Sequence, residues 1–289
     1  RAETRAAAQA GDWEAARRTN EAALALQPGH AGLLNNALLI AGFAGDVDGQ
    51  FRALERRAEA GLAFDLSGHD GAEALRAADP DRFTALEAAF AAIAAPVGDA
   101  RRVAEPPLKD ALIEALAVDS ETERLFLGSV ADRRIYRVEP YAPEEAEVFA
   151  GEADPIGSVF GLAVDRRHGR LYAATGAIEG VTPIGEGEAL GAALLALDLE
   201  TGDLIETYTI DGAGRMGDVS VRDGIVLVAD AEAGRVYRLD GPDARLELYA
   251  EDPRFESLQG VISSRGAVFV ADYALGLWRI DPVERAAAL

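Results

Sequence analysis

The sequence contains no cysteine, and this absence excludes disulfide bonds, thiolate metal sites and cysteine nucleophiles. Histidine is scarce as well, with His30, His69 and His168 far apart and each in an expected turn. No imidazole cluster or catalytic triad can be assembled from this local spacing. Phosphate-cradling P-loops and dinucleotide-binding glycine fingerprints are also missing. The sequence therefore offers few of the usual catalytic signatures.

Positive charge is in short supply. The 28 basic residues, of which only Lys109 is a lysine, face 50 acidic ones, and the net charge is −22. Such a charge repels phosphate backbones, so we exclude nucleic acid as a partner. It is compatible with cation binding, although a solvated acidic surface is the commoner reason for it.

Long apolar runs are absent too. The most apolar segment, residues 33–44, is shorter than the ~18 residues of a membrane span and contains Asn35 and Asn36. We therefore expect no membrane span in this chain. The chain starts at Arg1 and ends at Leu289 inside an unfinished repeat, so we expect both ends to be cut and any signal peptide to lie outside it.

A hairpin recurs in the second half of the chain, at 124–140, 225–241 and 267–282, with a degenerate copy at 170–202. Each clear copy is an apolar strand, a short polar turn and a strand with an aromatic residue followed by arginine: Tyr136-Arg137, Tyr237-Arg238 and Trp278-Arg279. Such repetition indicates one supersecondary unit used several times. We interpret it as a β-propeller.

From residue 111 onward, apolar residues alternate with polar ones, as in strands. The first three units each read as four strands: Glu114–Asp119, Leu125–Val130, Arg134–Val138, Ala146–Ala150; Phe160–Asp165, Arg170–Thr175, Ala193–Asp198, Leu204–Ile210; Asp218–Val221, Ile225–Asp230, Arg235–Leu239, Arg245–Ala250. The fourth unit reads as three, Gln259–Ser263, Ala267–Asp272 and Gly276–Ile280, one strand short. Propellers close into rings that protect strand edges, so we expect four blades of a larger, C-terminally truncated ring.

The first part of the chain has helical periodicity instead. Gly11-Asp12 ends one expected helix and caps the next, and Gly45-Asp46 repeats this 34 residues later. With its A-G-D-W-x-x-A and A-L-x-L-x-P patterns, this stretch resembles the tetratricopeptide repeat, which implies a groove for a protein partner. A helical cap or spacer is the alternative. The expected fold is thus α + β and multidomain, with a helical domain at 1–98, a proline-rich linker at 99–110 and a propeller at 111–289.

Short motifs carry a second resemblance. E-x-L-A-V-D at 114–119, F-G-L-A-V-D at 160–165 and Q-G-V at 259–261, each followed by a turn and a strand, resemble the six-bladed superfamily of regucalcin (senescence marker protein), gluconolactonases and strictosidine-synthase-like proteins. NHL-repeat propellers share the pattern. The resemblance implies a six-bladed ring with four blades present, and an exported bacterial protein, periplasmic or secreted.

The first strand of each propeller blade lines the central channel. Register along the units places Glu114, Phe160, Gly217 and Gln259 at the axial pocket, with Asp218 as the alternative to Gly217. In lactonases of the resembled family this ring holds a divalent cation. The resemblance therefore implies Glu114, Asp218 and Gln259 as ligands for Ca²⁺ or a similar ion. Gly217 stands where the family has Asn and Gln259 near its Asp, so Glu114 alone matches clearly.

Other candidate residues have structural explanations that we prefer. We expect Asp230 and Asp272 to cap turns and the three recurring aromatic residues to pack between blades. Their arginine neighbours should face solvent or pair with carboxylates of the next blade. The glycine-rich insertion 176–191 carries Glu179, Glu186 and Glu188, which either form a lid at the channel mouth or a solvated loop.

Three functions remain open from the sequence. The first is a binding protein with a small ligand or ion in the axial pocket and a protein partner at the helical repeats. The second is a metal-dependent lactonase or esterase-like hydrolase of the gluconolactonase type, whose support is the resemblance and Glu114. The third is a purely structural interaction module.

Overall fold

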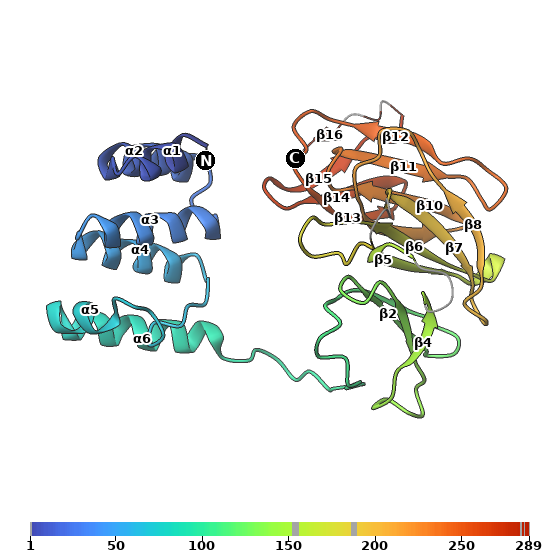
Figure 1. The fold of residues 1–289 in the computed structure, drawn as a ribbon, viewed down its shortest axis with the longest axis horizontal. Coiled ribbons are helices and arrows are strands. Elements are labelled where there is room, and N and C mark those ends of the chain that lie inside the picture. Colours follow the sequence, from blue (N-terminus) through green and yellow to red (C-terminus); the bar gives the residue numbers. More distant parts are fainter. Residues whose placement is uncertain (1, 152–155, 186–189, 284, 286, 289) are drawn as a thin grey trace. The chain divides into compact units, whose positions relative to one another are not determined.

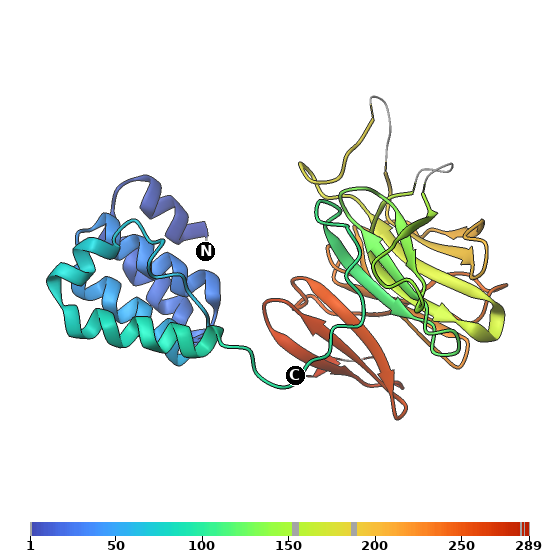
Figure 2. The same ribbon diagram turned by 90° about the horizontal axis from the view of Figure 1, so that it is seen from below.

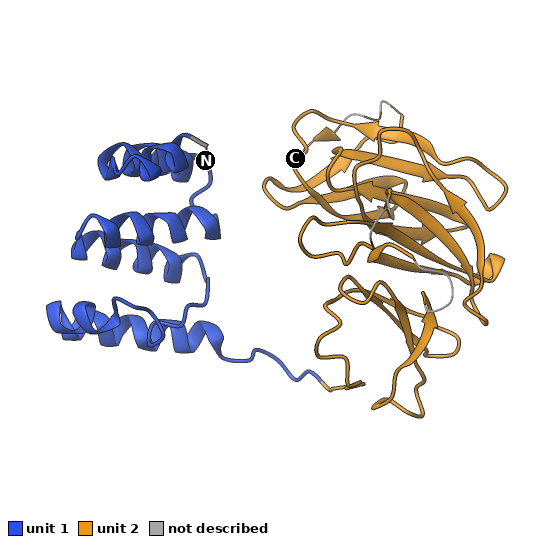
Figure 3. Ribbon diagram, viewed as in Figure 1, with its two compact units in different colours: residues 1–100 blue, residues 101–289 orange. Residues whose placement is uncertain are grey.

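The computed structural model describes residues 2–151, 156–185, 190–283, 285 and 287–288. It divides into two compact units, Arg1–Ala100 and Arg101–Leu289 (Figure 3). Residues 101–110 fall within the second unit, where the backbone N–H of Glu105 donates to the Pro143 carbonyl at 3.0 Å. No helix among the described residues has the length and apolar character to cross a membrane.

The first unit consists of helices that pack on one another in chain order (Figure 1). Their bounds are α1 Ala2–Gln9, α2 Trp13–Leu26, α3 Ala31–Phe43, α4 Val47–Glu59, α5 Ala72–Ala78 and α6 Pro80–Ala94. The last helix buries Phe83, Leu86 and Phe90 in the core of the unit. The predicted helical character of this part of the chain is confirmed.

Two equivalent turns punctuate this unit. Gly11 and Gly45 have positive φ angles of 73° and 68°, which glycine adopts without steric cost and which end α1 and α3. The following residues, Asp12 and Asp46, cap α2 and α4 by accepting hydrogen bonds from backbone N–H groups three residues later, at 2.9 and 2.8 Å. The predicted capping role of both Gly-Asp pairs is confirmed.

The second unit consists of four antiparallel sheets, each built from four consecutive strands in chain order. We call them blades 1 to 4. Their strands are β1 Ile113–Val118, β2 Leu125–Ser129, β3 Ile135–Val138, β4 Glu147–Ala150; β5 Ser158–Asp165, β6 Arg170–Gly176, β7 Ala193–Asp198, β8 Leu204–Tyr208; β9 Met216–Arg222, β10 Ile225–Asp230, β11 Arg235–Leu239, β12 Glu247–Glu251; β13 Leu258–Ser264, β14 Ala267–Asp272, β15 Gly276–Ile280, β16 Ala287–Ala288.

One strand prediction was wrong. The sequence indicated three strands in the last unit, whereas Ala287 and Ala288 form β16 and pair with Ile280 and Arg279 of β15. Two alanines carry no alternation of apolar and polar side chains, so the strand arises from backbone pairing alone.

The blades are arranged as in a β-propeller. The first strands β1, β5, β9 and β13 are neighbours in that order, which makes them the innermost strands, and Figures 1 and 2 show the sheets as separate blades side by side. An apolar cluster fills each of the three spaces between successive blades. Each blade therefore has a preceding face toward the blade before it and a following face toward the next one. The number of blades in a closed ring stays a prediction.

The recurring aromatic residues are packing residues, as predicted. Tyr237 and Trp278 are each 1% exposed and belong to the clusters between blades 2 and 3 and between blades 3 and 4. Tyr136 is also buried, but it lies on the preceding face of blade 1, and its hydroxyl donates to Asp132 at 2.6 Å.

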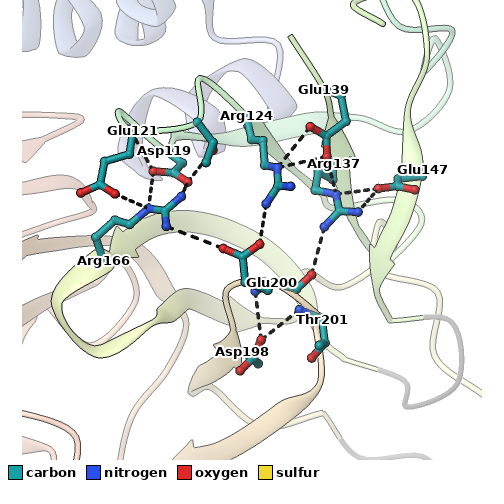
Figure 4. Close-up of polar contacts among 11 residues, drawn as sticks. Asp119, Glu121, Arg124, Arg137, Glu139, Glu147, Arg166, Asp198, Glu200 and Thr201 are labelled. Carbon is teal, nitrogen blue, oxygen red and sulfur yellow. Dashed lines mark hydrogen bonds and ion pairs between the residues drawn. The ribbon is translucent and has the colours of Figure 1, made fainter. Parts of the chain in front are cut away.

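Arginines and carboxylates connect blades 1 and 2 at the end opposite the start of the inner strands (Figure 4). The buried Asp119 at the end of β1 accepts hydrogen bonds from Arg166 of blade 2, one of them at 2.7 Å from Nε. Arg124 of blade 1 donates to Glu200 of blade 2 at 2.6 Å. This network ties together segments that the sequence separates by 47 and 76 residues.

The arginines that follow the aromatic residues were expected to face solvent or pair with the next blade. Arg137 instead pairs with Glu139 and Glu147 of its own blade and reaches the next blade through the carbonyl of Glu200, at 3.0 Å (Figure 4). Arg238 pairs with the nearby Asp240 at 2.7 Å. Arg279 is exposed, as expected. The ion pairs of Arg137 and Arg238 thus form within their own blades.

Asp119 should make folding acid-sensitive. Hydrogen bonds from Arg166 hold the pKa of its carboxyl at about 2, below the usual 3.8. A lowered folded-state pKa stabilises the fold above the unfolded-state pKa, and this contribution is lost as pH falls from about 4 to about 2. We expect Asp119→Asn to lower the free energy of unfolding at neutral pH by about 1–2 kcal/mol. The effect is no larger because Arg166 is partly exposed and water screens its interaction with Asp119. Urea unfolding of wild type and variant should converge toward pH 2; a pH-independent difference would contradict this.

Candidate functional site

Each inner strand has a β-bulge near its start, and the extra residue is at an equivalent place in every blade. The ladder skips one residue between Ile113 and Ala115, Val159 and Gly161, Met216 and Asp218, and Leu258 and Gly260. The bulged residues are therefore Glu114, Phe160, Gly217 and Gln259. Bulges re-aim side chains and often mark functional ends of sheets. Asp218 lies one position further along and is equivalent to Ala115, Gly161 and Gly260.

The second strands place a buried polar residue opposite these bulges. The four are Ser129, Thr175, Asp230 and Asp272. Asp230 accepts hydrogen bonds from the backbone N–H groups of residues 214, 215, 232 and 233, and Asp272 from those of residues 256, 257, 274 and 275. Their predicted role in capping turns is confirmed, because each carboxylate binds backbone N–H groups of two loops at this end of the propeller.

Phe160 has a cationic neighbour that the sequence did not indicate. The guanidinium of Arg215 lies over its ring, 5.4 Å from the centroid. Gly176 makes room for this arginine, since a Cβ at Gly176 would approach Arg215 Cγ to 2.9 Å. The only sequence signal is that Arg215 stands two residues before a bulge, where the other blades have Leu112, Ser158 and Ser257.

Arg215 differs from the arginines of the inter-blade network. Within the described part of the chain, its guanidinium contacts the Phe160 ring and forms no ion pair or hydrogen bond with a carboxylate. Arg124, Arg137 and Arg166 each bind carboxylates instead. The chain has a net charge of −22, and an arginine without a carboxylate partner can donate hydrogen bonds to the carboxylate of a ligand.

Asp218 is a half-buried carboxyl at this end. Its Oδ2 accepts a hydrogen bond from the backbone N–H of Val261 on the neighbouring inner strand, at 2.9 Å. Burial raises the pKa of this carboxyl above its usual value, because loss of water disfavours the charged form. The side chain therefore joins blade 3 to blade 4 through this hydrogen bond.

The remaining predicted positions are more open. Glu114 and Gln259 are exposed, and the Gln259 amide donates to Ser257 Oγ at 2.7 Å. Gly217 has no side chain, and a Cβ there would lie 3.0 Å from the Leu258 carbonyl oxygen.

A calcium site at these residues stays a prediction. Calcium takes 6–8 oxygen ligands. The predicted set offers two carboxylates and one carboxamide from three different strands, and both Asp218 and Gln259 already make hydrogen bonds within the protein. Among the residues the structure describes, no three histidine, aspartate or glutamate side chains converge.

The long insertion after β6 is anchored at the same end of the propeller. Thr182 is 7% exposed, contacts Ser158 Oγ at 2.9 Å and accepts from the Ile178 N–H at 2.7 Å. Arg133 of blade 1 donates to the Pro183 carbonyl at 2.9 Å. Glu179 is exposed, whereas Glu186 and Glu188 lie outside the described residues. A lid role for the three glutamates stays a prediction.

Comparisons with known proteins give weak likenesses. The sequence matches no protein-family model and no curated protein. Solved structures that it resembles include a streptogramin B lyase, with 14% identity, a TM-score of 0.47 and coverage of 63% of this chain and 55% of that one. A protein of unknown function from Bacteroides thetaiotaomicron has 13% identity and a TM-score of 0.42, with coverage of 60% of this chain and 46% of that one. Hydrazine synthase from Kuenenia stuttgartiensis has 10% identity and a TM-score of 0.49, with coverage of 67% of this chain and 52% of that one.

The chain spans about half the length of each of these structures. At such TM-scores the likenesses add nothing to the fold assignment, which rests on the four sheets, their order and the apolar clusters between them. The second unit is a β-propeller fold.

Proposed function

We propose that this chain is a binding protein whose propeller holds a small carboxylate-bearing ligand at the bulged ends of its inner strands. The observation that carries the proposal is Arg215, which lies over Phe160 at the first-strand bulge of blade 2 and binds no carboxylate in the described part of the chain. A guanidinium that lies over an aromatic ring keeps the N–H donors in its own plane free for a ligand.

We also propose that the helical unit binds a protein partner in a groove. A cavity of about 420 Å³ is lined by α1, Trp13 and α3, and the rings of Trp13 and Phe43 stack there with centroids 5.2 Å apart. Phe43 is 69% exposed and Leu39 46% exposed, which leaves apolar surface for a partner. The repeated Gly-Asp turns 34 residues apart favour a tetratricopeptide-like arrangement of these helices.

The ligand proposal is tested by calorimetric titration with acetate, gluconate, citrate and glutamate. We expect at least one of these to bind, and Arg215→Ala to weaken its binding at least tenfold, or about 1.4 kcal/mol. The matched control is Arg245→Ala, because Arg245 is an exposed arginine of blade 3, to which Arg215 also belongs. This variant should leave the dissociation constant unchanged. Lack of binding by the whole panel, or equal loss in both variants, would contradict the proposal.

Lactone hydrolysis is the alternative, supported by the motif resemblance and by the carboxylate of Glu114 at the bulge of blade 1. It is separated from pure binding by assaying gluconolactone with and without calcium, in wild type and in Glu114→Ala. Calcium-dependent turnover that disappears in the variant would replace the binding proposal. Turnover absent from both proteins, with carboxylate binding intact, would leave binding as the function.

A further inference from the structure

The helical unit contains three equivalent helices, each opened by the same aspartate cap. Asp12, Asp46 and Asp79 lie 34 and 33 residues apart, and each accepts a hydrogen bond from the backbone N–H three residues later. They open α2, α4 and α6, which Figure 1 shows in three successive layers of the unit. Residues at the same distance from each cap are therefore equivalent.

The contact between α4 and α6 is filled by side chains. Phe51 and Leu54 of α4 are 1% and 0% exposed in the core of the unit. The guanidinium of Arg82 on α6 lies over the Phe51 ring, 4.5 Å from its centroid. It also donates two hydrogen bonds to Glu55 of α4, at 2.6 and 2.8 Å. One arginine thus occupies space between these two helices.

The equivalent contact between α2 and α4 lacks these side chains. Arg17 and Asn20 of α2 replace the two apolar residues, and Gly49 of α4 replaces the arginine. A cavity of about 360 Å³ remains there, lined by these three residues and by residues of α3 such as Ala37 and Ala41. The cavity therefore follows from polar and small residues at places that are filled in the next contact.

Positive charge prevails around this cavity. Three of its lining residues are the arginines Arg17, Arg52 and Arg56, and two are acidic. Arg52 pairs with Asp46 at 3.3 Å, and Arg56 pairs with Glu21 at 3.0 Å. The guanidinium of the exposed Arg17 forms no ion pair or hydrogen bond with any residue that the structure describes. It is therefore available to bind the oxyanion of a ligand.

Asn20 supplies an acceptor at the same cavity. Its side chain is 1% exposed, and its Nδ2 donates to the Leu33 carbonyl at 3.0 Å. Because a carbonyl only accepts hydrogen bonds, this contact fixes which end of the amide is Oδ1. Oδ1 has no hydrogen-bond partner among the described residues. A buried acceptor without a donor costs free energy, and a hydroxyl or amino group of a ligand would remove that cost.

We propose that this cavity binds a small organic anion that carries a hydroxyl or amino group besides its carboxylate or phosphate. The oxyanion pairs with Arg17, and the hydroxyl or amino group donates to Asn20 Oδ1. The short side chains of Ala37, Ala41 and Ala53 leave room for the carbon skeleton. Only residues of the helical unit form this site, so the proposal does not rest on the ligand of the propeller.

The test is calorimetric titration of the full chain with lactate, serine, glycerol 3-phosphate and glucose 6-phosphate, which separates carboxylates from phosphates. We expect at least one probe to bind, and Arg17→Ala to weaken its binding by about tenfold or more. Arg18→Ala is the matched control, because Arg18 is the next residue of α2 but pairs with Glu14. Arg215→Ala should retain this binding, so failure of the propeller proposal and failure of this one are distinguishable.

Asn20→Leu is a second, independent variant, because leucine is the residue that α4 has at the equivalent place. It fills the cavity and removes the unpaired acceptor. We therefore expect it to abolish binding of the probe and to raise the urea concentration at which the helical circular dichroism signal is lost. Binding of no probe, equal weakening by Arg17→Ala and Arg18→Ala, or a destabilised Asn20→Leu that still binds would overturn the proposal.

Discussion

Trp278→Ala should destabilise the propeller by about 3–5 kcal/mol, more than alanine at either of the other two recurring aromatic residues, Tyr136 and Tyr237. The side chain is 1% exposed between blades 3 and 4 and packs edge-on against Phe255, with ring centroids 5.4 Å apart. The guanidinium carbon of Arg254 lies over the ring, 4.6 Å from its centroid. Truncation leaves a cavity between two sheets that cannot close without moving a whole blade. Urea unfolding followed by the β-sheet circular dichroism signal measures the loss.

Trp278→Phe is the control for this prediction. It keeps most of the contact with Phe255 and removes an indole N–H that has no hydrogen-bond partner among the described residues. Removing an unpaired buried donor offsets part of the free energy lost with the packing contacts. This variant should therefore cost less than about 2 kcal/mol. Equal destabilisation by both substitutions would show that the ring contacts do not hold the two blades together.

Gly161→Ala should also be strongly destabilising, by about 2–3 kcal/mol. A Cβ at this position would come within 2.7 Å of Asp218 Cα and 2.8 Å of Val219 N on the neighbouring inner strand. These are backbone atoms of β9, which is paired along its length with β10 and cannot yield without breaking that pairing. Denaturant unfolding, with hydrogen exchange of β5 and β9 amides, reports the change.

Gly260→Ala is the matched control, since Gly260 is the residue of blade 4 equivalent to Gly161. A Cβ there would meet Ala271 Cβ at 3.6 Å and Asp218 Oδ2 at 3.8 Å, both ordinary contacts. The effect on unfolding free energy should stay within about 0.5 kcal/mol. If Gly161→Ala were as mild as Gly260→Ala, the close approach of inner strands in blades 2 and 3 would be refuted.

The strands and their register could be predicted from the sequence because they depend on local patterns. Alternating apolar residues set the strands, and five of the predicted ranges, such as Ile225–Asp230, agree with the structure residue for residue. Counting along the repeats also placed Glu114, Phe160, Gly217 and Gln259 at equivalent positions, since a repeated unit folds the same way each time. The helix caps at Asp12 and Asp46 follow from contacts only three residues long.

Other features depend on contacts between distant segments, and no local pattern encodes them. Arg215 was overlooked because its partner Phe160 lies in another blade. The Asp119–Arg166 bond spans 47 residues. Strand β16 exists only because β15 offers it a free edge.

The helical part and the repeated β part of this protein can be recognised from local patterns, because periodicity and capping involve residues close together in the chain. Which repeated positions are covered depends on contacts between blades. Leu116 and Leu277 look in the sequence like Leu162 and Val236, their buried counterparts, yet they are 61% and 63% exposed. A side chain's burial depends on whether a neighbouring blade is present, and that is a property of the assembled arc rather than of any one repeat.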